Sequence, residues 1–140
     1  MKKLFSPLFA ILALLAFSSA HASELQPLTI DGAQTVTAEE LLDLVDQHPN
    51  LVIIDARSQG DYDKGHLPEV IRIKNDDVTA ETLAAAIDTK DTPTCFYCNG
   101  VNCARSADAI TKAKVAGYSN LYWFRGGIAE WQEKGFPVEL

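Results

Sequence analysis

The sequence predicts an α/β fold with a parallel sheet of about five strands and helices on both faces. Four short apolar runs alternate along the chain with segments of helical periodicity, which is typical of strand–helix–strand units. These runs are mostly continuously apolar instead of alternating with polar residues. Such runs indicate strands that helices cover on both faces.

The first half of the chain begins with a short strand near Thr35 and Val36. Thr37-Ala38-Glu39-Glu40 has the pattern of a capping box, so we expect a helix that begins here and ends near His48. Residues 51–54 predict the second strand, and residues 70–73 predict a weaker third one.

The second half continues the alternation, with Gly117 and Gly135 placed to end two of its helices. In the first of these helices we expect Leu83, Ala84 and Ile87 to face inward. The expected elements are, in order, a helix over 79–87, a strand over 94–97, a helix over 104–116, a strand over 121–124 and a helix over 127–134.

The N-terminus has the three parts of a signal peptide. Lys2 and Lys3 form a basic start, residues 8–17 are apolar, and Ala20-His21-Ala22 is a small-x-small cleavage pattern. We therefore expect cleavage after Ala22 and export to the periplasm, with an uncleaved anchor as the alternative. Residues 1–22 are then the signal peptide, 23–34 a loosely attached arm, and 35–140 one domain.

The mature chain is acidic. Lys2 and Lys3 are lost with residues 1–22, so 10 of the 12 Lys and Arg residues remain against 19 Asp and Glu, and the net charge falls from −7 to −9. Such a chain is a poor candidate for binding nucleic-acid phosphates. It is equally unsuited to anionic membranes after signal cleavage.

The segment 94–106 carries the chemistry. Cys98 follows an apolar strand directly, as Asp55 follows another, and ligands of parallel sheets bind at these carboxyl ends. Backbone N–H groups of the following loop and helix start can converge on the Cys98 sulfur, lower its pKa and make it reactive. The alternative is a buried packing residue or half of a structural disulfide.

Four segments resemble a single-domain rhodanese over roughly residues 37–138. They are Ile53-Ile54-Asp55-Ala56-Arg57, the Gly65-His66-Leu67-Pro68 segment, the Cys98 loop with Arg105-Ser106, and Phe124-Arg125-Gly126-Gly127 with Trp131 and Gly135-Phe136-Pro137-Val138. The resemblance implies a three-layer sandwich and a sulfurtransferase. Its cysteine would accept sulfane sulfur from a donor such as thiosulfate, hold it as a persulfide and pass it to cyanide, a thiol or a protein acceptor.

On this reading Cys98 is the catalytic residue, and neither a cofactor nor a metal ion is expected. Asp55 and Arg57 would brace the neighbouring loops, and Arg105 would add positive charge for an anionic donor. The residues expected to form the anion-binding loop are Asn99, Gly100, Val101, Asn102, Ala104 and Arg105.

The loop departs from the family pattern. Six residues separate Cys98 from Arg105, more than in the sulfurtransferases or in the phosphatases and arsenate reductases of this fold. The loop also carries Cys103, a candidate resolving thiol that would work with Cys98 and a redox partner. The alternatives are that Cys103 is the nucleophile of a shifted loop, or that a static Cys98–Cys103 disulfide leaves an inactive binding module.

The sequence predicts structural roles for the remaining candidate residues. Cys95 and Cys98 lie in a C-x-x-C pattern, but three steps along a strand separate their Cα atoms by ~10 Å, too far for a disulfide. Cys95 is therefore expected to be a buried packing residue, and His66 to pack its loop. We expect Arg125 to be solvated, with docking of an anionic donor as the alternative.

Overall fold

The computed structural model describes residues 26–140. Its centre is a five-stranded, all-parallel sheet with the strand order β1-β5-β4-β2-β3. The predicted α/β fold is confirmed. The strands are β1 (Ala33–Val36), β2 (Val52–Asp55), β3 (Ile71–Arg72), β4 (Thr94–Tyr97) and β5 (Leu121–Phe124).

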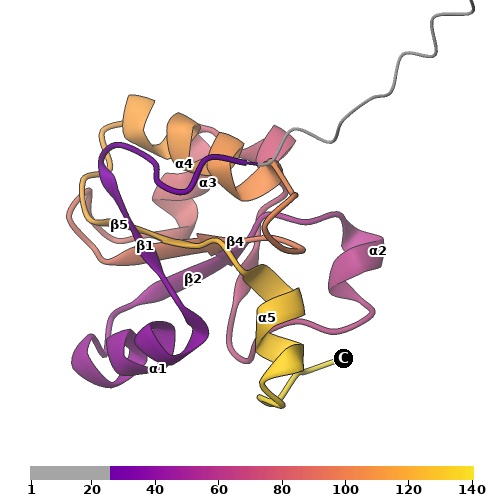
Figure 1. The fold of residues 1–140 in the computed structure, drawn as a ribbon. Helices are drawn as coiled ribbons and strands as arrows, with labels where there is room; N and C mark the ends of the chain where they lie inside the picture. The colour runs from indigo at the N-terminus through magenta and orange to yellow at the C-terminus, as the bar shows by residue number, and fades with distance from the viewer. Residues whose placement is uncertain (1–25) are drawn as a thin grey trace, which may run out of the picture.

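Helices cover both faces of the sheet (Figure 1). Helices α3 (Ala80–Ala86) and α4 (Arg105–Val115) lie on one face, and α1 (Ala38–Gln47) and α5 (Gly127–Glu133) lie on the other. Because successive side chains of a strand point to opposite faces, Phe96 enters the core under α3 and α4, whereas Cys95 and Tyr97 enter the core against α1 and α5. This gives the predicted three layers.

The predicted helix ends are largely confirmed. Thr37 caps α1 in a complete capping box with Glu40. Thr79 makes the same reciprocal arrangement with Thr82 at the start of α3. Gly117 has a φ of +93° just after α4, a left-handed conformation that glycine adopts at little cost.

Several local expectations were wrong. Strand β1 contains Thr35 and Val36 as expected but begins earlier, at Ala33, and the expected third strand β3 is shorter than 70–73, since it pairs over two residues only. Ala84 is exposed, while Ala86 packs against the core. The four-residue helix α2 (Gln59–Tyr62) and the 3-10 turn η1 (Asn75–Asp77) were not predicted, because one turn is too short to show a helical period.

The signal-peptide residues and the cleavage position after Ala22 lie outside the described residues. At the start of the described part, the carbonyls of Gln26 and Pro27 accept hydrogen bonds from the Arg125 guanidinium. Arg125 therefore holds the arm, instead of being solvated as predicted. Within residues 26–140, no helix has the length and apolar character needed to cross a membrane.

Candidate active site

Cys98 lies at the carboxyl end of β4, between the ends of β5 and β2, and begins the loop that leads to α4. It is only 1% exposed. Its thiol donates a hydrogen bond to the carbonyl oxygen of Cys103 at 3.3 Å, and its sulfur lies 3.3 Å from the hydroxyl of Ser106. Cys98 therefore sits at the bottom of the loop, as expected.

Ser106 connects this sulfur to the core. Its hydroxyl oxygen accepts a hydrogen bond from the indole N–H of Trp123 at 2.9 Å. Because an indole nitrogen only donates, the hydroxyl proton of Ser106 is left free to point at the Cys98 sulfur. The backbone N–H of Ser106 is directed at the same sulfur. Both contacts favour negative charge on Cys98. The N–H contact is of the kind expected from the sequence, whereas the hydroxyl contact was not foreseen.

Cys103 is the more exposed of the two loop cysteines. It is partly buried, and its sulfur meets the Cys98 thiol and the backbone N–H groups of Asn99 and Arg105. The hydrogen bond from Cys98, with these N–H groups and the Arg105 charge, lowers the pKa of Cys103 to about 5. The same hydrogen bond, together with burial, raises the pKa of Cys98.

The expected lowering of the Cys98 pKa was therefore wrong. The N–H groups of Asn99 and Arg105 act on Cys103 instead. The proton of the pair lies on Cys98, and the negative charge lies on Cys103.

Helix α5 sets the direction of these N–H groups. Its Ile128 and Ala129 N–H groups each donate, at 3.0 Å, to the carbonyls of Cys98 and Asn99. In a peptide unit the C=O and the following N–H point in opposite directions. The Asn99 N–H is therefore turned away from α5 and toward the loop interior, where Cys103 lies.

Gly127 allows the backbone of α5 to approach the backbone of the Cys98 loop closely. Its φ is +59°, and a Cβ atom at this position would collide with the carbonyl of Cys98. Gly100 is less constrained, because a Cβ there would meet Ala129 only at ordinary contact distance.

The outer face of the loop is an open depression of about 410 Å³. Its lining consists of Asn99, Gly100, Val101, Asn102, Cys103 and Ala129. Ala104 lies at the N-cap of α4 and makes no side-chain cap. Cys103 belongs to this lining and Cys98 does not.

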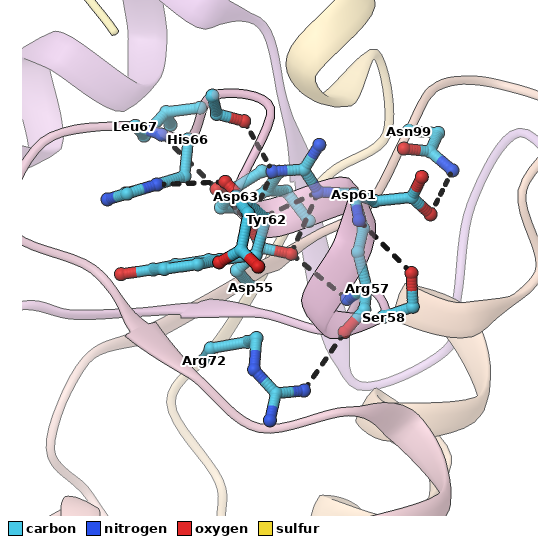
Figure 2. Close-up of polar contacts among 12 residues, drawn as sticks. Asp55, Arg57, Ser58, Asp61, Tyr62, Asp63, His66, Leu67, Arg72 and Asn99 are labelled. Atoms are coloured by element: carbon cyan, nitrogen blue, oxygen red, sulfur yellow. Dashed lines mark hydrogen bonds and ion pairs between the residues drawn. The ribbon is translucent and has the colours of Figure 1, made fainter. Parts of the chain in front are cut away.

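Arg105 is not a free positive charge. Its guanidinium lies 3.2 Å from the carboxylate of Asp61. The same carboxylate accepts from the Asn99 side chain at 3.5 Å (Figure 2). Hydrogen bonds from Ser58, Asn99 and Arg105 lower the pKa of Asp61. Asp61 belongs to the unpredicted helix α2, so the sequence analysis could not place it beside Arg105.

Asp55 and Arg57 form a buried network beside the loop (Figure 2). The Arg57 guanidinium binds the Asp55 carboxylate at 2.6 to 3.1 Å and donates to the Gly65 carbonyl at 2.9 Å. The Tyr97 hydroxyl donates to Asp55 and accepts from the Leu67 N–H. The network joins β2, β4 and residues 65–67, and its hydrogen bonds do not reach either loop sulfur.

The other candidates have structural surroundings. Cys95 is fully buried, and burial raises its pKa to about 12, which confirms the prediction of a packing residue. His66 stacks on Tyr62 at 3.7 Å, and its Nδ1 donates to the Tyr62 carbonyl at 3.1 Å. Among residues 26–140, no group of three His, Cys, Asp or Glu side chains is arranged to hold a metal ion.

Comparison with known proteins gives a consistent family. The family described as rhodanese-like domain matches residues 37–134. The uncharacterized protein YibN of Escherichia coli K12 is 26% identical over 106 residues, which cover 75% of this chain and 71% of YibN. The probable adenylyltransferase/sulfurtransferase MoeZ of Mycobacterium tuberculosis is 29% identical over 103 residues, 74% of this chain but only 26% of MoeZ.

Solved structures agree with the fold. The rhodanese-like domain of the Anabaena protein Alr3790 superposes with a TM-score of 0.65 at 22% identity, covering 75% of this chain and 77% of that domain. At this identity the likeness concerns the arrangement of helices and strands.

Proposed function

The chain belongs to the rhodanese-like domain family, and on that premise we propose that it is a sulfurtransferase that holds sulfane sulfur on Cys98 as a persulfide. The observation that carries the proposal is the position of Cys98 at the end of β4, with the hydroxyl and N–H of Ser106 directed at its sulfur. These donors stabilise a thiolate or persulfide anion there. The sulfurtransferase name of MoeZ supports the same class of reaction.

The proposed cycle has two displacements. In the first, a cysteine thiolate attacks the sulfane sulfur of thiosulfate, the sulfur–sulfur bond of the donor breaks, and sulfite leaves with the electron pair. In the second, a thiophilic acceptor attacks the outer sulfur of the persulfide, and Cys98 leaves as a thiolate. The acceptor is cyanide, a small thiol or a protein thiol. Cysteine supplies both the nucleophile and the leaving group, so the cycle uses no cofactor.

Mass spectrometry tests this proposal. The reduced mature protein is treated with thiosulfate and its intact mass is measured, and the added sulfur is then located by peptide mapping. We expect a gain of one sulfur atom on Cys98, and its loss when cyanide is added. A Cys95→Ala variant is the matched control, because Cys95 is buried away from the loop and should load like the wild type.

One result would contradict the proposal. If no form gains sulfur, and the folded protein holds a Cys98–Cys103 disulfide that resists reduction, the domain is an inactive binding module.

A second candidate is thiol–disulfide exchange with a redox partner. The closeness of the two cysteines favours it, since the Cys98 thiol donates to the carbonyl oxygen of Cys103 at 3.3 Å. The two candidates are separated by the product: exchange converts a partner disulfide into a dithiol with no gain of sulfur, whereas transfer leaves sulfur on Cys98.

We also propose that the protein works in the periplasm after cleavage behind Ala22. The basic start, apolar run and Ala-x-Ala pattern of residues 1–22 support this. The mass of the protein from the periplasmic fraction should correspond to a chain that begins at Ser23. A full-length chain in the membrane fraction would instead indicate an uncleaved anchor.

A further inference from the structure

We propose that Cys103, not Cys98, takes the sulfur from the donor, and that Cys103 then passes it to Cys98. This inference rests on the proposed function, since it concerns the route by which sulfur reaches the Cys98 persulfide. It assigns Cys103 as a second catalytic residue, an entry thiol in front of a storage thiol.

Access is the first argument. Cys103 lines the open depression on the loop's outer face, whereas Cys98 is 1% exposed and lies behind it. The attacking sulfur must approach the donor's sulfur–sulfur bond from behind, along the bond axis. A donor that enters the depression presents this bond to Cys103 before it can reach Cys98.

Charge is the second argument. The thiolate, not the thiol, is the nucleophile, and the loop gives the negative charge to Cys103. The groups that face its sulfur are the N–H of Asn99, the N–H and guanidinium of Arg105 on α4, and the Cys98 thiol. Asp61 on α2 faces this guanidinium and offsets part of its charge. The pKa of Cys103 is lowered and that of Cys98 is raised, so of the two thiols Cys103 gives up its proton first.

The same groups make Cys103 a good leaving group. A thiol of low pKa leaves faster in exchange between sulfur atoms, so a persulfide on Cys103 readily gives its outer sulfur to a neighbour. Cys98 is that neighbour, because its thiol already donates to the carbonyl oxygen of Cys103 at 3.3 Å. In the Cys98 persulfide, the Ser106 hydroxyl lies against the inner sulfur, which is the Cys98 Sγ.

The steps balance as follows. The Cys103 thiolate displaces sulfite from thiosulfate and becomes a persulfide anion. The Cys98 thiol gives its proton to this persulfide and attacks the outer sulfur. The bond between the outer sulfur and Cys103 breaks, Cys103 returns to a thiolate, and Cys98 carries the persulfide with the proton. Neither an oxidant nor a reductant is consumed.

The experiment follows the added sulfur in wild type and in a Cys98→Ser variant. Reduced protein is mixed with thiosulfate, the reaction is stopped over a series of times, and peptide mapping locates the sulfur. We expect the Cys98→Ser variant to gain one sulfur atom on Cys103. The sulfur should stay there, because the variant lacks the Cys98 thiol that would accept it. Wild type should end with the sulfur on Cys98. Cys95→Ala is again the control, with the wild-type result.

A second measurement uses the wild-type protein alone. Iodoacetamide at neutral pH should alkylate Cys103 at least about tenfold faster than Cys98, because it reacts with exposed thiolates. The alkylation rates of the wild-type protein test the proposal even if the Cys98→Ser variant does not fold.

The outcomes separate the two proposals. If wild type loads Cys98 but Cys98→Ser, folded by circular dichroism, gains nothing, the donor is attacked by Cys98 directly and the entry role of Cys103 fails. If iodoacetamide alkylates Cys98 faster than Cys103, the entry role of Cys103 fails as well. If neither wild type nor any variant gains sulfur, the proposed sulfurtransferase function fails instead.

Discussion

Ser106 shows how one side chain can serve stability and chemistry together. It lies in the first turn of α4 and is 1% exposed. Its oxygen accepts the Trp123 N–H, and its proton is left for the Cys98 sulfur. The sequence contains a hint of this role. A hydroxyl residue in the first helical turn after the loop lies close to the end of the strand that precedes the loop.

Replacing Ser106 with alanine should lower the free energy of unfolding by about 1–3 kcal/mol, because the buried Trp123 N–H loses its acceptor. Urea unfolding measures this loss. The persulfide on Cys98 should also be shorter-lived, as followed by intact mass over time. Ser119→Ala is the matched control, since Ser119 is exposed and bonds only the Lys90 carbonyl through its hydroxyl. An equal loss in both variants would contradict the role of the Trp123 contact.

Asp61 tunes the charge at the loop entrance, since its carboxylate is paired with Arg105. Asp61→Asn should free the guanidinium for an anionic donor. The KM for thiosulfate should fall about 1.4- to fivefold, the size expected for a partly exposed ion pair worth ~0.2–1 kcal/mol. Steady-state kinetics at low salt measures it. Asp63→Asn on the same turn is the control, and an unchanged KM in Asp61→Asn would show that Arg105 does not meet the donor.

The lowered pKa of Cys103 should make the free energy of unfolding depend on pH. Its pKa is about 5 in the folded protein against an ordinary 9.0. Between these values the unfolded chain binds a proton that the folded chain does not, so stability rises with pH. The stabilising effect of Cys103 is fully present above the unfolded pKa and is lost as the pH falls toward about 5. The shift of Cys98 has the opposite effect only above pH 9.0.

Urea unfolding under reducing conditions checks this. The difference in the free energy of unfolding between wild type and Cys103→Ser should grow from about pH 5.5 to about pH 8. A constant difference would mean that Cys103 is protonated in the folded state.

At the scale of elements, α5 shapes the reactive loop without contributing a reactive side chain. Its first N–H groups hold the carbonyls of Cys98 and Asn99, and the bare Cα of Gly127 lets the backbones meet. Sequence analysis predicted α5 and its glycine pair but not this task. The reason is physical: which peptide N–H points into a loop depends on the partner of the neighbouring carbonyl, and that partner is distant in sequence.

Gly127→Ala should therefore disturb both fold and site. A positive φ costs a residue with a Cβ about 1–2 kcal/mol, and the collision with the Cys98 carbonyl adds to it. We expect a loss of more than ~2 kcal/mol in urea unfolding and a marked loss of sulfur loading by mass. The control is Gly60→Ala, where a Cβ meets open space. A wild-type loading rate in Gly127→Ala would contradict the orienting role of α5.

At the scale of the whole molecule, the parallel sheet separates two cores, and the Asp55–Arg57–Tyr97 network fastens its strands to residues 65–67. The sheet and four main helices could be predicted because their apolar runs and caps are local signals. The short helix α2 and the pairing of Cys103 with its N–H groups could not. They depend on where distant segments meet.

Tyr97→Phe tests the network. It removes one hydrogen bond from the buried Asp55 carboxylate and the acceptor of the Leu67 N–H. The expected loss is about 1–3 kcal/mol in the free energy of unfolding, with sulfur loading retained because the network does not reach the loop sulfurs. Tyr122→Phe on β5 is the control, since Tyr122 is half-buried and lies outside this network. Loss of loading without loss of stability would assign the network a direct role.

The strand order also determines when the sheet can be completed. Within the described sheet, β1 lies at an edge and pairs with β5 alone, and Leu121 comes 88 residues after its partner Ala33. A chain that leaves the ribosome or a translocation pore from its N-terminus has no partner for its first strand until β5 emerges. Contacts this distant in sequence form slowly. The β1 edge of the sheet therefore stays unpaired for most of the chain's synthesis and closes only when the last seventh of the chain arrives.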